Sequence, residues 1–463
     1  MPTRKSEVHP FSLTTPFLSV LINLHGKKCP VKKYIKIVPL ILFIFLASLT
    51  YAQSRNSLFL EKLFNKIPDS TFREVYHHPG KYRLQIIYTQ INRDRHNKPS
   101  FTNYYFNADS NLYFNPASTV KMPLSFLALQ KLNETNKHGV NKYTAMLTDS
   151  SFTGQTAAMA DSTSATGLPS IAQYIRKVFL ISDNDAYNRL YEFLGQQYIN
   201  RSLHKMGYTD VHITRRFAPA GSEENRHTNN IRFVDNDGKL LYQQSPAYNT
   251  DSFAFRQTIK IGKAYLDNND SLINEPMDFT TANKVSLEDL QQIEQSALFP
   301  SSVPANKRFN LNDEDERFLY RYMSQYPSET NYPKYDTSVY YDSYVKNYFK
   351  NTSHKIPSYI RIFNKPGWAY GFLTDVSYIA DFENKVEFML SCTLYVNSDG
   401  VLNDNKYDYD SIGYPFLYTL GQTIYQYELK RKRKHKPDLG RFIIRYDQRD
   451  PNDKRPVIKD ADN

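Results

Sequence analysis

Apolar and β-branched side chains gather in two groups of short segments, one near each end of the chain. Such runs, bounded by polar turn residues, favour β-strands. Near the N-terminus they predict strands over residues 82–92 and 104–114, with Asn107-Ala-Asp-Ser110 as the turn. Near the C-terminus they predict an antiparallel meander over residues 360–363, 372–382 and 386–396.

Helical spacing of apolar positions dominates the chain between these groups and after the second one. It predicts helices over residues 119–134, 171–180, 185–193, 286–298 and 413–429. Gly195 follows one helix as a stop signal, and Ser286 precedes another as an N-cap. The order of strands, helices, strands and a helix predicts an α+β fold whose terminal segments meet in one sheet.

Two segments do not follow these patterns. Residues 228–351 are rich in Asn, Asp and Tyr and are too long for a loop, so we expect an insertion that contains helices of its own. Residues 437–463 are charged and poor in large apolar side chains, so we expect a loosely attached C-terminal tail. The main domain would then span residues 53–436.

The N-terminus has the pattern of an export signal. Five lysines between Lys27 and Lys36 precede an apolar run over 37–49, and Thr50-Tyr51-Ala52 offers a cleavage site. The run is shorter than the about 20 residues that span a bilayer, although an uncleaved anchor remains the alternative. We therefore expect residues 1–52 to be a signal peptide and the mature protein to be periplasmic or secreted. The mature chain keeps only Cys392, so it cannot form an intrachain disulfide.

The distribution of charge along the chain limits the kinds of partner that this protein could bind. The net charge is +11, but residues 1–52 hold seven Lys/Arg and one Glu, so their removal leaves +5. Residues 430–441 hold seven Lys/Arg and one Asp, which leaves the body of the protein nearly neutral. This distribution argues against a nucleic-acid-binding protein. The basic segment is either a solvated charge run or a contact with a membrane or cell-wall surface.

Candidate chemistry begins at Ser118-Thr-Val-Lys121. Residues three apart on a helix share a face, so Lys121 can act as the base that a serine nucleophile needs. Ser202 to Lys205 and Ser343 to Lys346 have the same spacing, but only Ser118 follows a strand and a turn and opens an apolar helix.

Two later motifs complete a candidate site. Ser182-Asp183-Asn184 could direct a hydroxyl and an amide into a cleft, although Ser182 or Asp183 could equally cap a helix. In Lys365-Pro-Gly367, Lys365 could attract an anion and Gly367 would allow close approach of a substrate, although this tripeptide is also a common turn. The amides of Ser118 and Trp368 could form an oxyanion hole. No paired His or Cys spacing indicates a metal, and we expect no cofactor.

The order S-x-x-K, S-D-N and K-x-G resembles the class A β-lactamase family, over residues 82–429. Phe114-Asn-Pro-Ala-Ser-Thr-Val-Lys121 is similar to the nucleophile segment of that family, and Gly371 and Asp375 continue the third motif in the same way. The resemblance implies an α/β sandwich, with a five-stranded antiparallel sheet between helices and a helical lobe. It also implies that Ser118 is acylated, that Lys121 carries the proton, and that Ser182, Asn184, Lys365 and Gly367 line the cleft.

The chain departs from the family pattern in three places. Pro366 replaces a Thr or Ser whose hydroxyl would bind a substrate carboxylate, and the interval between the second and third motifs is longer than usual. The deacylating glutamate of the family would fall near Phe217 or Ala218, whereas the first acids are Glu223 and Glu224. Either glutamate could position water, or both could be solvent-facing charges. Without a placed base, the acyl-enzyme would persist.

These observations predict an exported serine hydrolase that acts on β-lactams or related amide and ester substrates, with Ser118, Lys121, Ser182 and Glu224 as catalytic residues. The alternatives are a D,D-peptidase-like acyl transferase acting on cell-wall peptides, and a non-catalytic binding module on the same fold. The expected partner is a small molecule or a peptide.

Overall fold

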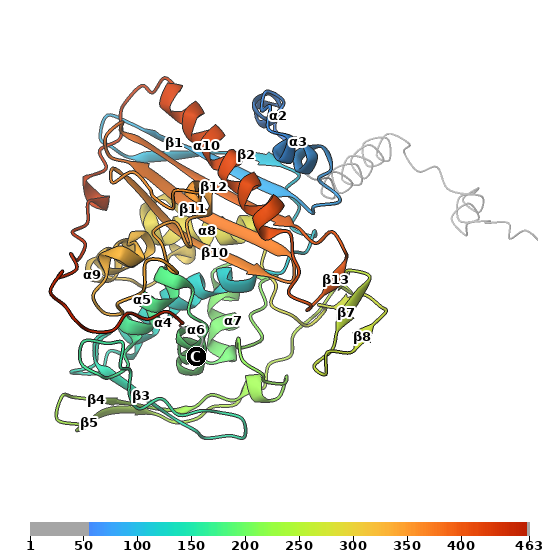
Figure 1. The fold of residues 1–463 in the computed structure, drawn as a ribbon. Helices are drawn as coiled ribbons and strands as arrows, with labels where there is room; N and C mark the ends of the chain where they lie inside the picture. Colours follow the sequence, from blue (N-terminus) through green and yellow to red (C-terminus); the bar gives the residue numbers. More distant parts are fainter. Residues whose placement is uncertain (1–54, 461–463) are drawn as a thin grey trace, which may run out of the picture. The chain divides into compact units, whose positions relative to one another are not determined.

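A five-stranded antiparallel sheet joins segments from the two ends of the described chain (Figure 1). This computed structural model describes residues 55–460, so the predicted signal segment at residues 1–52 lies outside the described residues. In the order of the sheet, the strands are β10 (Ile360–Ala369), β11 (Phe372–Asp381), β12 (Val386–Tyr395), β1 (Gln85–Arg93) and β2 (Pro99–Phe106). The predicted α+β fold with one antiparallel sheet is confirmed.

Two of these strands differ from the sequence prediction. β2 ends at Phe106, because Asn107 has the left-handed φ of 49°, and it therefore lies earlier than predicted. The turn of the hairpin lies instead at residues 94–98, where the Asp94 carboxylate accepts hydrogen bonds from the amides of His96 and Lys98. β10 continues through the third motif instead of ending before it, and its pairing with β11 extends to Ala369.

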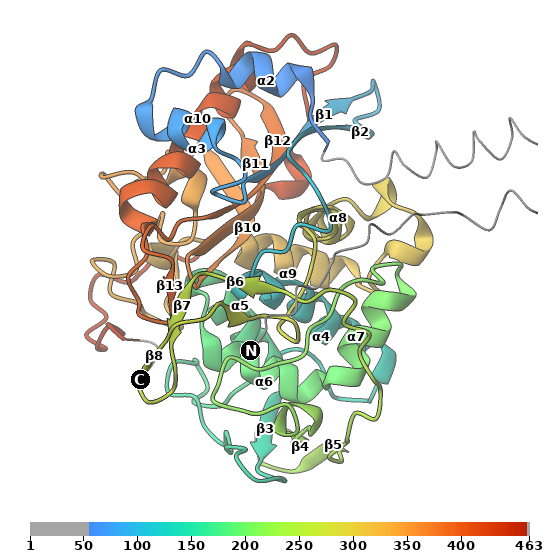
Figure 2. The ribbon, with the colours of Figure 1, turned by 90° about the vertical axis from the view of Figure 1, so that its right-hand side faces the viewer.

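Three helices cover one face of the sheet (Figures 1 and 2). They are α2 (Leu58–Phe64), α3 (Ser70–His77) and α10 (Tyr414–Lys430). Their apolar side chains form one buried cluster with every second residue of the strands, including Tyr88, Phe388 and Leu390. The other side chains of the same strands, among them Val376 and Tyr378, face the second layer of helices.

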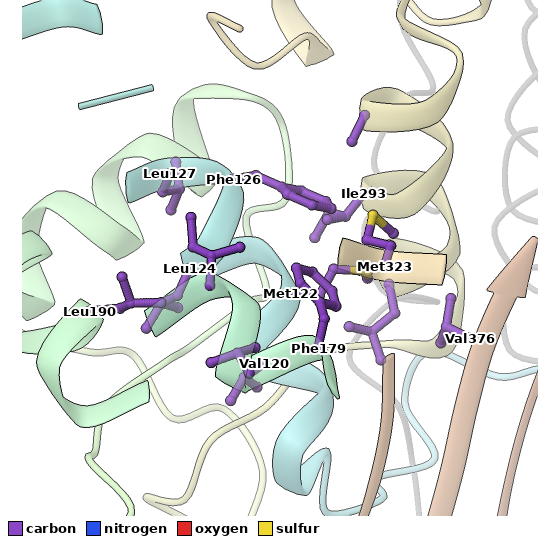
Figure 3. Packing of buried hydrophobic residues seen from close by; sticks show 14 of the residues in the cluster. Val120, Met122, Leu124, Phe126, Leu127, Phe179, Leu190, Ile293, Met323 and Val376 are labelled. Atoms are coloured by element: carbon purple, nitrogen blue, oxygen red, sulfur yellow. The ribbon is translucent and has the colours of Figure 1, made fainter. Parts of the chain in front are cut away.

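The second layer contains the helices that carry the first two motifs. It consists of α4 (Lys121–Thr135), α5 (Ile171–Ile181), α6 (Asn184–Leu194), α7 (Gln196–Lys205), α8 (Leu287–Leu298) and α9 (Asp313–Ser324). α4 is buried on most of its surface, because other helices and the sheet surround it. In Figure 3, Val120 from the turn before this helix and Met122 and Phe126 from the helix itself belong to the same buried cluster as Phe179, Ile293 and Met323. This packing fixes the segment that carries Ser118 and Lys121.

The predicted insertion at residues 228–351 does contain helices, namely α8 and α9. It also contributes short strands, which are β4 (Asn230–Val234), β5 (Leu240–Gln244), β6 (Lys260–Ile261), β7 (Ala264–Leu266), β8 (Leu272–Ile273) and β9 (Met277–Asp278). β4 pairs with β3 (Ala145–Asp149), and β7 pairs with β13 (Val401–Leu402). Over residues 55–460, no helix combines the length and the apolar character needed to cross a membrane.

The C-terminal segment after residue 436 packs on the body, which corrects the expectation of a loosely attached tail. Leu439 and Phe442 are buried in the same cluster as α4 and α8. Further along, the amide of Ile458 donates a hydrogen bond of 2.8 Å to the carbonyl of Lys334. The few apolar residues of this charged segment therefore hold it in place.

Candidate active site

Ser118 lies in a strained turn that leads into α4. The turn is a short 3₁₀ helix, Ala117–Val120, and the preceding Ala117 has a left-handed φ of 44°. Non-glycine residues adopt this conformation at a cost, and such strain gathers at functional sites. Local hydrogen bonds hold the turn, because the Asn115 amide oxygen accepts from the Ala117 amide at 2.8 Å and Thr119 Oγ1 donates to the Pro116 carbonyl at 2.7 Å. Ser118 itself is partly exposed.

Lys121 connects the first motif to the second. Its side chain is completely buried, and its ammonium donates to the carbonyl of Ser182 and to Asn184 Oδ1 at 2.7 Å. It also lies 3.2 Å from the Asp183 carbonyl and 3.4 Å from Ser182 Oγ. A buried ammonium requires such acceptors, since desolvation without them is costly.

The sequence left open whether the second motif caps a helix or directs polar groups into the site. In the structure it does both. The Asp183 carboxylate accepts a hydrogen bond of 2.7 Å from the Ala186 amide and caps α6. Ser182 has a left-handed φ of 67° between α5 and α6, and this turn directs its hydroxyl toward both lysines. Asn184 is exposed at the start of α6.

Lys365 comes from the edge strand β10 and meets the same hydroxyl. It is completely buried and donates to Ser182 Oγ and to the Pro366 carbonyl, each at 2.8 Å. Burial, followed by the nearby charge of Lys121, holds the pKa of Lys365 well below its usual value. The Ser182 hydroxyl therefore bridges two buried amino groups, which is a route for moving a proton.

Gly367 brings β10 against the Ser118 turn. A Cβ at this position would lie 2.6 Å from the Pro116 carbonyl oxygen and 2.8 Å from the amide nitrogen of Ser118. Only glycine fits so close an approach without displacing the backbone. Trp368 follows directly and lines the cleft beside Ser118. Pro366 is tolerated within β10 because the strand lies at the edge of the sheet.

The cleft next to Ser118 has a volume of about 720 Å³. Aromatic rings and amides dominate its lining, which comes from six stretches of chain: Asn115, Ala117, Ser118, Asn184, residues 215–220, residues 277–279, Ala282, Asn283, residues 368–370, Asn403, Asn405, Tyr407 and Tyr409. The insertion supplies residues 277–279, Ala282 and Asn283 of this lining. No group of three His, Cys, Asp or Glu within residues 55–460 is arranged to hold a metal ion.

The structure brings seven of the eight predicted site residues to the cleft or to the buried groups behind it, and Glu224 is the exception. Glu224 is not part of the cleft lining, and its carboxylate lies against Gly221. The neighbouring Glu223 is exposed, and its carboxylate lies 3.2 Å from His227 Nε2. Neither glutamate is part of the cleft lining around Ser118.

Phe217 and Ala218 occupy the cleft wall where the family resemblance would place a carboxylate. The Phe217 ring stacks on Tyr187 with a centroid separation of 4.5 Å, and Lys121 Nζ lies 5.2 Å from its centre. Asp278 is the acidic residue in the described lining, and its carboxylate accepts a hydrogen bond of 2.7 Å from the Thr280 amide. The wall beside Lys121 is therefore apolar.

Sequence reasoning missed the groups that support the site. Arg216 anchors the wall segment, because its buried guanidinium pairs with Glu192 at 3.3 Å and donates to the carbonyls of Glu224 and His227. The local sequence Arg215-Arg216 gives no sign of which arginine is buried.

A further buried lysine, Lys346, lies behind β10. Lys346 donates to Asn364 Oδ1 at 2.6 Å, and Asn364 donates to Asp375 at 2.8 Å. Burial lowers the pKa of Lys346 to about 7 and raises the pKa of Asp375 to about 6. Ser343 and Lys346, which have the S-x-x-K spacing, are therefore a buried part of the fold. Nothing in the sequence except that spacing distinguishes them.

The sequence profile of the β-lactamase enzyme family matches residues 79–242, which include the first two motifs. No curated protein matches the chain.

Among solved structures, the chain is similar to a β-lactamase from Francisella tularensis, with 13% identity, a TM-score of 0.44, and 78% of this chain and 99% of that one covered. A β-lactamase from Sphaerobacter thermophilus has 14% identity and a TM-score of 0.41, with 78% and 98% covered. One from Streptomyces albus G has 13% identity and a TM-score of 0.40, with 77% and 99% covered. The family match over residues 79–242 and the five-stranded antiparallel sheet together indicate a β-lactamase-like fold.

Proposed function

We propose that this protein is an exported serine hydrolase that forms an acyl-enzyme at Ser118 with β-lactams or related amide and ester substrates. The observation that carries the proposal is the convergence of three distant segments at Ser182 Oγ, where Lys121 and Lys365 both donate behind a cleft lined by Ser118. Two buried amino groups around one hydroxyl are costly for a fold and are typical of proton-transfer chemistry.

In the proposed reaction, Lys121 reacts as the neutral amine. The Ser118 hydroxyl oxygen attacks the carbonyl carbon, and the hydroxyl proton passes to the Lys121 nitrogen, which becomes an ammonium. The amides of Ser118 and Trp368 receive the negative charge that develops on the carbonyl oxygen. When the carbon–nitrogen bond breaks, Lys121 returns the proton to the leaving nitrogen through the Ser182 hydroxyl. The products are an ester at Ser118 and a free amine, which in a β-lactam stays attached to the acyl group.

Hydrolysis of that ester needs a water and a base to activate it. The cleft wall beside Lys121 holds Phe217 and Ala218, and Glu224 is not part of the cleft lining. We therefore propose that deacylation is slow compared with acylation. This favours the D,D-peptidase-like acyl transferase as the second candidate, since an amine could accept the acyl group in place of water.

Intact-mass spectrometry after incubation with benzylpenicillin tests the acylation step. We expect one adduct on the wild-type protein, which persists for minutes or longer, and no adduct on Ser118→Ala. Ser202→Ala is the matched control, because Ser202 and Lys205 have the same spacing outside the cleft lining, and this variant should be acylated like the wild type. Fast loss of the adduct with product release would favour an efficient β-lactamase. Absence of an adduct with lactams and activated esters would favour the binding module.

Export is tested separately, by expressing the full chain in a Gram-negative host and sequencing the N-terminus of the periplasmic protein. A new N-terminus at Gln53 is the expected result. Retention of the full chain in the membrane fraction would support the uncleaved anchor.

A further inference from the structure

The two arginines in the cleft lining differ in what their side chains contact. Arg216 is buried, and its guanidinium pairs with Glu192 and donates hydrogen bonds to two backbone carbonyls. Arg215 is exposed to the cleft, and within residues 55–460 no carboxylate pairs with its guanidinium. A cation that lines a cleft without a partner is available to a ligand of opposite charge.

The backbone of Arg215 is fixed in place before any ligand binds. Its amide donates to Asn283 Oδ1 at 3.2 Å, and its carbonyl accepts from the Tyr187 hydroxyl at 2.9 Å. Asn283 also accepts from the amide of Thr214 at 2.7 Å, so one side chain of the insertion holds two consecutive residues of the wall. Fixing this backbone beforehand lowers the entropy that ligand binding must remove.

The other cations near Ser118 are not available to an anionic ligand. Lys121 and Lys365 are completely buried and donate to Ser182 and to other oxygens of the protein. Pro366 lacks a hydroxyl that could donate to an anion beside Lys365. The one acid of the described lining, Asp278, does not pair with Arg215 and is held by the Thr280 amide.

We propose that Arg215 is a specificity-determining residue that binds a carboxylate on the substrate that acylates Ser118. The planar guanidinium can donate two parallel hydrogen bonds to a carboxylate, which Lys and neutral side chains cannot do. The insertion thus contributes to specificity by holding Arg215 through Asn283. This inference rests on the proposed function, because the ligand is the acyl donor itself.

Noncovalent binding separates the inference from catalysis. In a Ser118→Ala background, calorimetric titration would compare benzylpenicillin with its methyl ester, which differs by one negative charge. We expect benzylpenicillin to bind about 10- to 100-fold more tightly, with the difference shrinking as salt is raised. Adding Arg215→Gln should remove this preference and leave the affinity for the ester within about twofold. Arg215→Lys should restore it in part, because charge returns without the planar fork.

Arg256→Gln is the matched control, since Arg256 is also an exposed arginine but lies outside the cleft lining, and it should leave the preference intact. The inference would be overturned if Arg215→Gln lost affinity equally for benzylpenicillin and its methyl ester while its melting temperature stayed unchanged. It would also be overturned if this variant kept the wild-type preference for benzylpenicillin over the ester. Failure of acylation at Ser118 alongside an Arg215-dependent preference would instead refute the proposed chemistry and leave the anion site standing.

Discussion

At the scale of single residues, the contact between Gly367 and the Ser118 turn is the tightest constraint on the site. A Cβ at position 367 would lie within 2.8 Å of two amide nitrogens and within 2.6 Å of a carbonyl oxygen. Gly367→Ala should therefore push β10 away from Ser118 and lower the acylation rate by about 10²-fold, as misplacement near 1 Å does elsewhere. The rate of adduct formation measures this effect.

Gly80→Ala is the control for that substitution, because nothing lies within 4 Å of an added Cβ and the residue has no left-handed conformation. Its acylation rate should match the wild type. If the acylation rate of Gly367→Ala also matches the wild type, the close approach of β10 to the Ser118 turn is not needed for the reaction.

Ala218 tests the proposed cause of slow deacylation. It lines the cleft on the wall that carries Phe217, so a glutamate there would bring a carboxylate toward Ser118. We expect Ala218→Glu to speed loss of the acyl group by about 10²-fold, a typical contribution of a general base. Ala218→Gln has nearly the same size without the charge and should leave the adduct as long-lived as in the wild type. The decay of the adduct in a mass time course decides between these outcomes.

At the scale of elements, long apolar segments were predictable and strained ones were not. The helix predicted at 286–298 forms α8 (Leu287–Leu298), and Ser286 caps it by accepting from the Asp289 amide. α7 (Gln196–Lys205) was missed because its sequence is mostly polar. β10 extends further than expected because Pro366 and Gly367 disfavour a strand locally, and only its edge position admits them.

Glu294 on α8 gives the fold a pH dependence. Its carboxylate is completely buried with neither oxygen hydrogen-bonded, and burial, followed by Asp375, raises its pKa well above the usual value. The folded protein therefore keeps a proton that the unfolded chain releases above about pH 4.5, so the free energy of unfolding should fall as pH rises from there.

Glu294→Gln removes this ionisation, and its free energy of unfolding should fall less steeply than that of the wild type between pH 5 and pH 8. The difference between the two curves should amount to at most about 4 kcal/mol over this range, because one bound proton contributes about 1.4 kcal/mol per pH unit, and urea unfolding measures it. Glu383→Gln changes an exposed glutamate and should keep the wild-type slope. Parallel curves for Glu294→Gln and the wild type would show that the carboxylate does not stay protonated in the fold.

At the scale of the whole molecule, the order of motifs predicted which segments meet, but not what surrounds them. Ser118, Lys121, Ser182 and Lys365 converge as their spacing indicated, because the sheet and α4 to α6 bring three distant segments together. The position of Glu224 was not predictable, since a loop can direct a nearby acid to either side. The insertion was visible as a long polar segment, but its contact with Arg215 through Asn283 depends on tertiary packing.

The packing of the C-terminal segment on the body was also not predictable from the sequence, and it can be tested directly. Phe442 is buried among four aromatic rings, those of Phe299, Tyr320, Phe363 and Tyr378, with centroids 4.9–5.4 Å away. Phe442→Ala should lower the free energy of unfolding by about 3–5 kcal/mol, the usual cost of emptying an aromatic site in a core. The neighbouring Ile443 is 67% exposed, so Ile443→Ala should change the free energy of unfolding little.

Because Phe363 belongs to β10 and precedes Lys365 by two residues, Phe442→Ala should also slow acylation. Equal stability of the two variants in urea would mean that the segment does not hold β10 in solution.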